Sequence, residues 1–232
     1  MSKPILTLLF LLFFGIGMYA QPKVVGEPRV IAKTSEPLEK PVWSSNGKTL
    51  YFTSVNDGAR WEVSHKGKKL KKSSARKAVQ PIVKTNANQL LQQMVDEPQK
   101  VASQVKGLES LSGYILFNPV LSPKGDQIVF QVGKGKGMFV CNADGSNLRS
   151  LGKGGRATWM PDGKFIVVTM TEDDGHTITK SELIVINVAT GDQTKLLSSD
   201  KLIAYNPTIS PNGKKIAFEN FTDGTIYVMD LQ

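Results

Sequence analysis

The sequence predicts an all-β protein, a five-bladed β-propeller of four-stranded antiparallel blades that is closed by an N-terminal strand. Three observations lead to this prediction. A short motif occurs five times, each copy is followed by apolar segments separated by Gly turns, and the two chain ends offer complementary strands. A period near 40 residues filled with short strands is typical of propeller blades.

The five motif copies begin at Pro41, Pro81, Pro119, Ala157 and Pro207, at spacings of 40, 38, 38 and 50 residues. In the third copy, residues 119–122 are the first predicted strand, and residues 127–132, 138–142 and 147–151 are the next three. The turns between them contain Pro and Gly in the positions that tight turns require. The second copy, 81–118, is degenerate, and whether it forms a full four-stranded blade stays open.

The chain ends complement each other. The last unit stops after its third strand, which ends at residue 231, and the segment 28–35 near the N-terminus has the pattern of a fourth. Pairing the two would complete the last blade and remove an exposed strand edge. We therefore expect a single propeller domain over residues 21–232, closed by this strand.

Residues 1–20 have the pattern of a secretory signal peptide. Lys3 is followed by an apolar run over residues 5–14, and cleavage is expected after Ala20. The run is short for a membrane span, which needs roughly 20 residues, although an uncleaved anchor is the alternative. The mature chain would then have no transmembrane segment and would be periplasmic or secreted. Its one cysteine, Cys141, has no disulfide partner and is expected to be a buried, inert thiol.

The formal net charge is +9, and the excess is concentrated in one region of the sequence, at Lys66, Lys68, Lys69, Lys71, Lys72, Arg76 and Lys77. Export and the lack of interleaved aromatic residues argue against a nucleic-acid partner. The run is either an exposed outer strand protected by its lysines or a contact for an acidic glycan, lipid head groups or an acidic protein.

One face of the predicted propeller is more elaborate than the other. The fourth unit is twelve residues longer than the third, and eleven of these extend the loops between the second and third strands and between successive blades. Long loops on a rigid scaffold are frequent binding sites. The predicted partner-binding face comprises Lys134, Lys136, Lys153, Glu172, Asp173, Asp174 and His176. The acidic spacing matches no known metal motif, so no metal and no cofactor are predicted.

The residues just before each first strand are expected to ring the mouth of the central channel. They are Lys40, Gln80, Asn118, Arg156 and Asn206, with Tyr205 beside them. All five ring members are polar and none is acidic. They either satisfy loop backbone groups or form a polar pocket for an anionic or sugar ligand, on which Tyr205 would stack.

A catalytic role is disfavoured. Glycoside hydrolysis needs two carboxylates facing each other, and the predicted inner strands carry none, which leaves Glu39 as the one carboxylate expected near the mouth. His65 and His176 stand in no recognisable nucleophile arrangement. We predict a non-enzyme, with a polysaccharide lyase as the less favoured alternative.

Four segments resemble the PD40 (WD40-like) repeats of TolB-type propellers, and together they extend the resemblance over the mature chain. They begin at Ala143, Trp159, Ile209 and Ile226, and the second reads Trp-Met-Pro-Asp-Gly-Lys-Phe-Ile. The resemblance implies the fold, whereas the repeat occurs in binding proteins, lyases and peptidase propellers. The family pattern is a six-bladed ring behind an α/β domain, whereas five blades and no further domain are expected here. The predicted function is a protein-binding module of the cell envelope, with a glycan or small-anion binder as the alternative.

Overall fold

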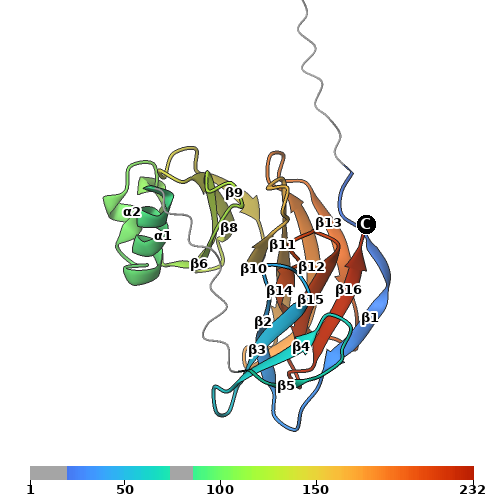
Figure 1. Cartoon of the computed structure of the whole chain (residues 1–232). Helices are drawn as coiled ribbons and strands as arrows, with labels where there is room; N and C mark the ends of the chain where they lie inside the picture. The colour runs from blue at the N-terminus through green and yellow to red at the C-terminus, as the bar shows by residue number, and fades with distance from the viewer. Residues whose placement is uncertain (1–19, 74–85) are drawn as a thin grey trace, which may run out of the picture.

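The computed structural model describes residues 20–73 and 86–232, which contain four antiparallel sheets of four strands each. We number the sheets by the sequence unit that supplies them (Figure 1). Sheet I contains β2 (Leu38–Trp43), β3 (Thr49–Ser54), β4 (Arg60–Ser64) and β5 (Lys71–Lys72). Sheet III contains β6 (Leu116–Leu121), β7 (Gln127–Val132), β8 (Gly137–Asn142) and β9 (Arg149–Gly152).

The remaining two sheets complete the repeat. Sheet IV contains β10 (Gly155–Trp159), β11 (Phe165–Asp173), β12 (Ile178–Asn187) and β13 (Gln193–Ser198). Sheet V contains β14 (Ala204–Ile209), β15 (Lys215–Asn220), β16 (Ile226–Leu231) and β1 (Val24–Ala32). In the described residues, the predicted four-strand pattern is thus confirmed for the first, third, fourth and fifth units.

The predicted N-terminal strand is confirmed as the fourth strand of the last sheet. β1 pairs antiparallel with β16, from Val24 opposite Leu231 to Ala32 opposite Ile226. The strand lies a few residues earlier than the predicted 28–35, because Lys23 and Gln232 also exchange backbone hydrogen bonds at 3.0 and 2.9 Å. The edge of β16 is therefore covered by the other end of the chain.

The second unit does not form the predicted strands in its described part. It contains α1 (Asn86–Asp96), α2 (Val101–Gln104) and the 3₁₀ turn η1 (Glu109–Leu111), which we call the helical layer. Buried Leu90 and Met94 stand four residues apart, the spacing of one helix face, and Leu108 and Leu111 continue the apolar side. This period, and the absence of the Gly turn, favour helix over strand. Residues 81–85, where the first strand of this unit was predicted, lie outside the described residues.

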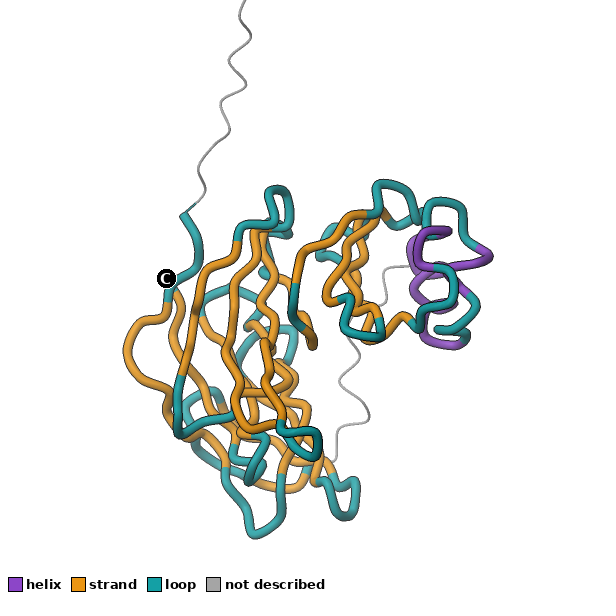
Figure 2. The backbone as a smooth tube through the Cα atoms, turned by 180° about the vertical axis from the view of Figure 1, so that it is seen from behind, coloured by secondary structure: helices purple, strands orange, loops and turns teal. Residues whose placement is uncertain are grey.

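The sheets pack face to face in the order I, V, IV, III. Separate apolar cores join I with V, V with IV, and IV with III. The helical layer covers the remaining face of sheet III, where Met94 and Leu108 pack against Phe130. In Figures 1 and 2, the helical layer and sheet III stand apart from sheet I. The described residues therefore form an open series of four sheets, and the predicted closed five-bladed ring is not confirmed.

Two smaller expectations concern single features. Cys141 is buried in the core beneath the helical layer, and this burial, reinforced by Asp144, raises the pKa of its thiol to about 12. The thiol is therefore protonated and unreactive at neutral pH, as predicted. No described helix has the length and apolar character needed to cross a membrane.

Candidate functional site

The four described members of the predicted mouth ring share one unusual backbone conformation. Lys40, Asn118, Arg156 and Asn206 have positive φ angles of 53°, 47°, 51° and 46°. Each lies at a register shift between the first two strands of its sheet. A left-handed conformation at a non-glycine residue costs of order 1–2 kcal/mol, so its fourfold repetition identifies a position that the fold holds under strain. The fifth member, Gln80, lies outside the described residues.

The bulges bring polar side chains of sheets III, IV and V together. Arg156 donates from Nε to the Tyr205 hydroxyl at 3.1 Å and from Nη1 to the Asn118 side-chain oxygen at 3.2 Å. Its guanidinium also lies over the Tyr205 ring, 5.2 Å from the centroid. The rings of Tyr205 and Phe221 pack edge-to-face at a centroid distance of 5.3 Å. Arg156 is therefore held from both sides, and one face of Tyr205 is covered.

On the other side of the mouth, sheets I and V meet at a carboxylate that the sequence analysis did not place there. The Glu219 side chain accepts hydrogen bonds from Asn206 Nδ2 at 2.9 Å and from the backbone N–H of Lys40. Glu219 is only 6% exposed. The expectation that Glu39 is the one carboxylate near the mouth is therefore wrong.

Glu219 could have been found from the repeat register. In each sheet, the residue just before the strained one pairs with a polar residue of the second strand. The pairs are Glu39 with Thr53, Phe117 with Gln131, Gly155 with Thr169, and Tyr205 with Glu219. In three of the four sheets this polar residue follows a phenylalanine, as Glu219 follows Phe218. Aligning the second strands, in addition to the first, reveals a second polar row behind the ring.

Burial raises the pKa of Glu219 to about 7, and the nearby charge of Glu39 adds to this effect. The hydrogen bonds from Lys40 and Asn206 favour the ionised form but do not outweigh the loss of water around the carboxylate. Near neutral pH the carboxyl group therefore holds a proton for much of the time. This makes the junction of sheets I and V sensitive to pH.

Replacing Glu219 with Gln is expected to change how stability depends on pH. The carboxyl titrates near 4.5 when unfolded and near 7 when folded, so the folded chain holds the extra proton between these values. The stability of the wild type relative to Glu219→Gln should be highest below pH 4.5 and fall by roughly 3 kcal/mol as pH rises to 7. Urea unfolding of both proteins over this range measures the difference.

Glu97→Gln serves as the control, because it removes an exposed carboxylate beside the helical layer, away from the junction of sheets I and V. A flat difference between the wild type and Glu219→Gln would contradict the raised pKa.

Exposed apolar side chains gather on the same face as the mouth. Phe117 and Phe221 are 40% and 42% exposed, and Ile115 and Val55 are 38% and 54% exposed. Val55 and Phe221 occupy equivalent positions after the second strands of sheets I and V. The Val55 N–H donates to the Pro37 oxygen, and the Phe221 N–H donates to the Ile203 oxygen. We call this side of the molecule, with the ring and these loops, the mouth face. Four of the seven large apolar residues exposed in the described chain belong to it.

The long loop of the fourth unit is a projecting hairpin. Strands β11 and β12 extend beyond the other sheets, with Glu172 opposite Lys180 and a turn at residues 174–177. Asp174 caps this turn by accepting the N–H groups of His176 and Thr177, both at 2.9 Å, and these bonds lower the pKa of its carboxyl. Glu172, Asp173 and His176 are exposed.

The predicted basic residues Lys134, Lys136 and Lys153 lie in loops next to strands of sheet III. Lys134 and Lys136 place their ammonium groups 5.5 and 5.3 Å from the centroid of the Tyr114 ring, and Lys153 is exposed. In the described chain, Glu172 pairs with Lys180 and with none of these three lysines. The described residues of the whole chain contain no group of three His, Cys, Asp or Glu side chains arranged to hold a metal ion.

These observations define a propeller-type scaffold of four blade-like sheets with a polar mouth. No protein-family model matches the chain. No curated protein matches it either. Among solved structures, a protein assigned as TolB from Agrobacterium tumefaciens is similar over 86% of this chain and 60% of that one, at 20% identity and a TM-score of 0.41.

Two further solved structures show comparable similarity. TolB from Acinetobacter baumannii matches 88% of this chain and 45% of that one, at 16% identity and a TM-score of 0.37. Oligogalacturonate lyase from Vibrio parahaemolyticus matches 87% and 51%, at 15% identity and a TM-score of 0.36. This chain spans less than two thirds of the length of these structures. The fold described above rests on the sheet topology and not on these similarities.

Proposed function

We propose that this chain is an exported, non-catalytic binding module that docks a protein partner of the cell envelope through its mouth face. The observation that carries the proposal is the combination on one face of a strained polar ring and exposed apolar side chains. Protein–protein contacts combine exposed aromatic and apolar side chains with polar groups that form hydrogen bonds, and the mouth face presents both. The signal-like segment 1–20 supports a periplasmic or secreted location.

The arrangement of charged groups argues against catalysis. Glycoside hydrolysis needs two carboxyl groups free to act on the substrate, whereas Glu39 at the junction of sheets I and V pairs with Lys40 at 2.8 Å. Both oxygens of Glu219 already accept hydrogen bonds. A lyase would need a free base, whereas Arg156 is held by Tyr205 and Asn118.

The aromatic residues also favour a protein over a glycan. A sugar-binding site needs an open aromatic platform, but Arg156 covers one face of Tyr205, and Phe221 packs edge-to-face with the same ring. The exposed apolar side chains Phe117, Phe221 and Ile115 instead lie beside the polar ring and form a mixed surface with it. The acidic hairpin beside it would orient a partner that carries positive charge.

Site-specific photo-cross-linking in native cells tests this proposal. A photoreactive phenylalanine analogue at Phe117 or Phe221 is expected to capture one discrete envelope protein, identified by mass spectrometry. The triple variant Glu172→Gln, Asp173→Asn, Asp174→Asn should lower its recovery about tenfold, at roughly 0.5 kcal/mol for each exposed charge. Asn at position 174 retains an acceptor for the turn.

Two controls match these changes. The photoreactive residue at Val95, which is 58% exposed on α1, should capture no such protein. The variant Asp96→Asn, Glu97→Gln, Glu109→Gln removes the same charge from the helical layer and should leave recovery unchanged. Equal capture from Val95 and Phe221 would contradict the assigned face. Capture of no protein, together with binding of an acidic oligosaccharide, would establish the glycan alternative.

A further inference from the structure

Five exposed cations lie together at the end of sheets I and V that is remote from the mouth. Lys48 follows the first turn of sheet I, Lys66, Lys68 and Lys69 lie in its last turn, and Arg29 lies on β1. We call this group the basic corner. In the described part of the chain none of the five has an ion-pair partner, whereas Lys71 and Lys72 pair with Glu62 and Asp57.

Hydrogen bonds hold the three elements of the basic corner together. Arg29 Nη2 donates to the backbone oxygen of His65 at 3.5 Å, and the His65 N–H donates to the Lys48 oxygen at 2.9 Å. The last turn of sheet I is closed by two bonds between Ser64 and Lys68, both at 3.1 Å. The cations are therefore mounted on a fixed backbone and not on a free loop.

The charge at this corner is poorly compensated. His65 lies at its centre, and the pKa of its imidazole is lowered first by burial and then by the charges of Lys66, Lys215, Arg29 and Lys48. The neighbouring acid Asp230 pairs with Lys215. A positive potential from several unpaired groups attracts a polyanionic partner.

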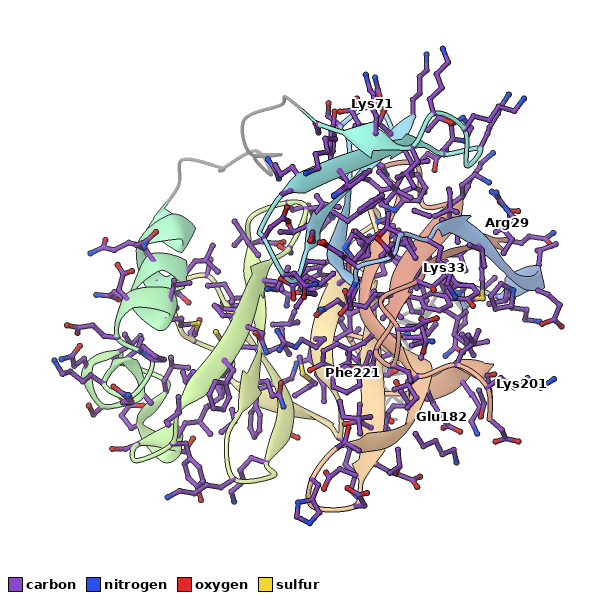
Figure 3. All side chains as sticks on the ribbon, turned by 90° about the horizontal axis from the view of Figure 1, so that it is seen from below. Arg29, Lys33, Lys71, Glu182, Lys201 and Phe221 are labelled. Carbon is purple, nitrogen blue, oxygen red and sulfur yellow. The ribbon has the colours of Figure 1, made fainter. Side chains whose placement is uncertain are left out.

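An exposed apolar side chain accompanies these cations. Val25 in β1 is 50% exposed and lies opposite Asp230, whereas Arg29 lies opposite Val228. Val228 and Asp230 are two residues apart in β16, so Val25 and Arg29 project from the same face of sheet V. Figure 3 shows Arg29 on β1, near the edge of the molecule. A polyanionic glycan would match the cations but leave Val25 in water. An anionic bilayer surface matches both, because its head groups attract lysine and its interface accepts small apolar side chains.

We infer that the basic corner docks on a membrane surface of anionic lipids and thereby leaves the mouth face free. The contact is peripheral, and it is independent of the partner proposed above. Because Arg29 and Lys66–Lys69 belong to two different sheets, the attachment requires the folded chain. It should weaken as ionic strength rises, since salt screens exposed charges.

Binding to vesicles tests the inference on the protein purified after export, with its N-terminus checked by mass spectrometry. The wild type is expected to bind vesicles of phosphatidylcholine mixed with phosphatidylglycerol and not vesicles of phosphatidylcholine alone. The variant Lys66→Gln, Lys68→Gln, Lys69→Asn should bind about a hundredfold more weakly, at about fivefold for each lysine near the surface. Asn is chosen at position 69 because Lys69 has a φ of 63°.

The control variant Lys100→Gln, Lys106→Gln, Lys201→Gln has the same net charge as the first triple variant. It should bind anionic vesicles as tightly as the wild type does. Val25→Ser should weaken vesicle binding several-fold without affecting binding of inorganic polyphosphate. Equal losses in the two triple variants would overturn the inference. The inference would also be overturned if the wild type bound polyphosphate but did not bind the anionic vesicles. The ligand would then be a soluble polyanion. Partner capture at Phe221 should be unchanged in all three variants.

Discussion

A chain that lacks residues 21–35 is expected to aggregate and to lose its single cooperative unfolding transition. These residues include β1, which covers the edge of β16 and contributes the buried side chains Ile31 and Ala32 to the core between sheets I and V. Removing them exposes a row of unpaired backbone groups together with apolar surface. Calorimetry and size-exclusion chromatography of the truncated and the mature chain measure the effect.

Two neighbouring substitutions provide the matched control for this truncation. Ile31 is 4% exposed and Val30 is 54% exposed. Ile31→Ala should lower the free energy of unfolding by about 2–5 kcal/mol, and Val30→Ala by no more than about 0.5 kcal/mol. A truncated chain that stays soluble and melts cooperatively would show that sheet V is complete without β1.

A second large effect is expected where the helical layer meets sheet III. A Cβ atom on Gly145, in the turn between β8 and β9, would lie 2.7 Å from Val105 Cγ1 and 2.9 Å from the Lys106 oxygen. Gly145 also has a φ of +91°. Gly145→Ala should therefore destabilise the chain by about 2–5 kcal/mol, the sum of the backbone cost and the overpacking cost.

Gly191→Ala separates these two contributions. Gly191 lies in the corresponding turn of sheet IV with a φ of +81°, and an added Cβ would meet nothing within 4 Å. It should therefore show only the backbone cost, about 1–2 kcal/mol. Denaturant unfolding compares the two variants. Equal destabilisation would mean that residues 105–106 do not pack against this turn, and would contradict the position of the helical layer.

The sheets that the repeat motif predicted were predictable for a local reason. Their turns contain Gly47, Gly125, Gly163 and Gly213, each with a positive φ, and the strands on either side alternate or are fully apolar. Such turn and strand preferences depend on a few adjacent residues. The second unit was misinterpreted because Pro81 matches the start of the motif, whereas the residues after it, with Leu90 and Met94 four apart, have a helical period.

The candidate site was predictable in part. The repeat register placed Lys40, Asn118, Arg156 and Asn206 at equivalent positions, and the structure gives all four the same backbone conformation. It also brings Arg156 against Asn118 and Tyr205. The basic loop residues Lys134 and Lys136 contact the ring of Tyr114, a residue that the sequence analysis did not single out.

The sequence by itself determined the strands and their turns, because turn chemistry and apolar periodicity act over neighbouring residues. It also indicated the pairing of the chain ends, because the last repeat lacks a strand that the N-terminal segment supplies. Only the tertiary structure decided where Glu219 meets Lys40, 179 positions away, and how far that contact removes the carboxylate from water. It also decided that the helical layer covers sheet III and that the four described sheets pack in the order I, V, IV, III. These features depend on which surfaces remain to be buried once the local elements have formed, which no single segment encodes.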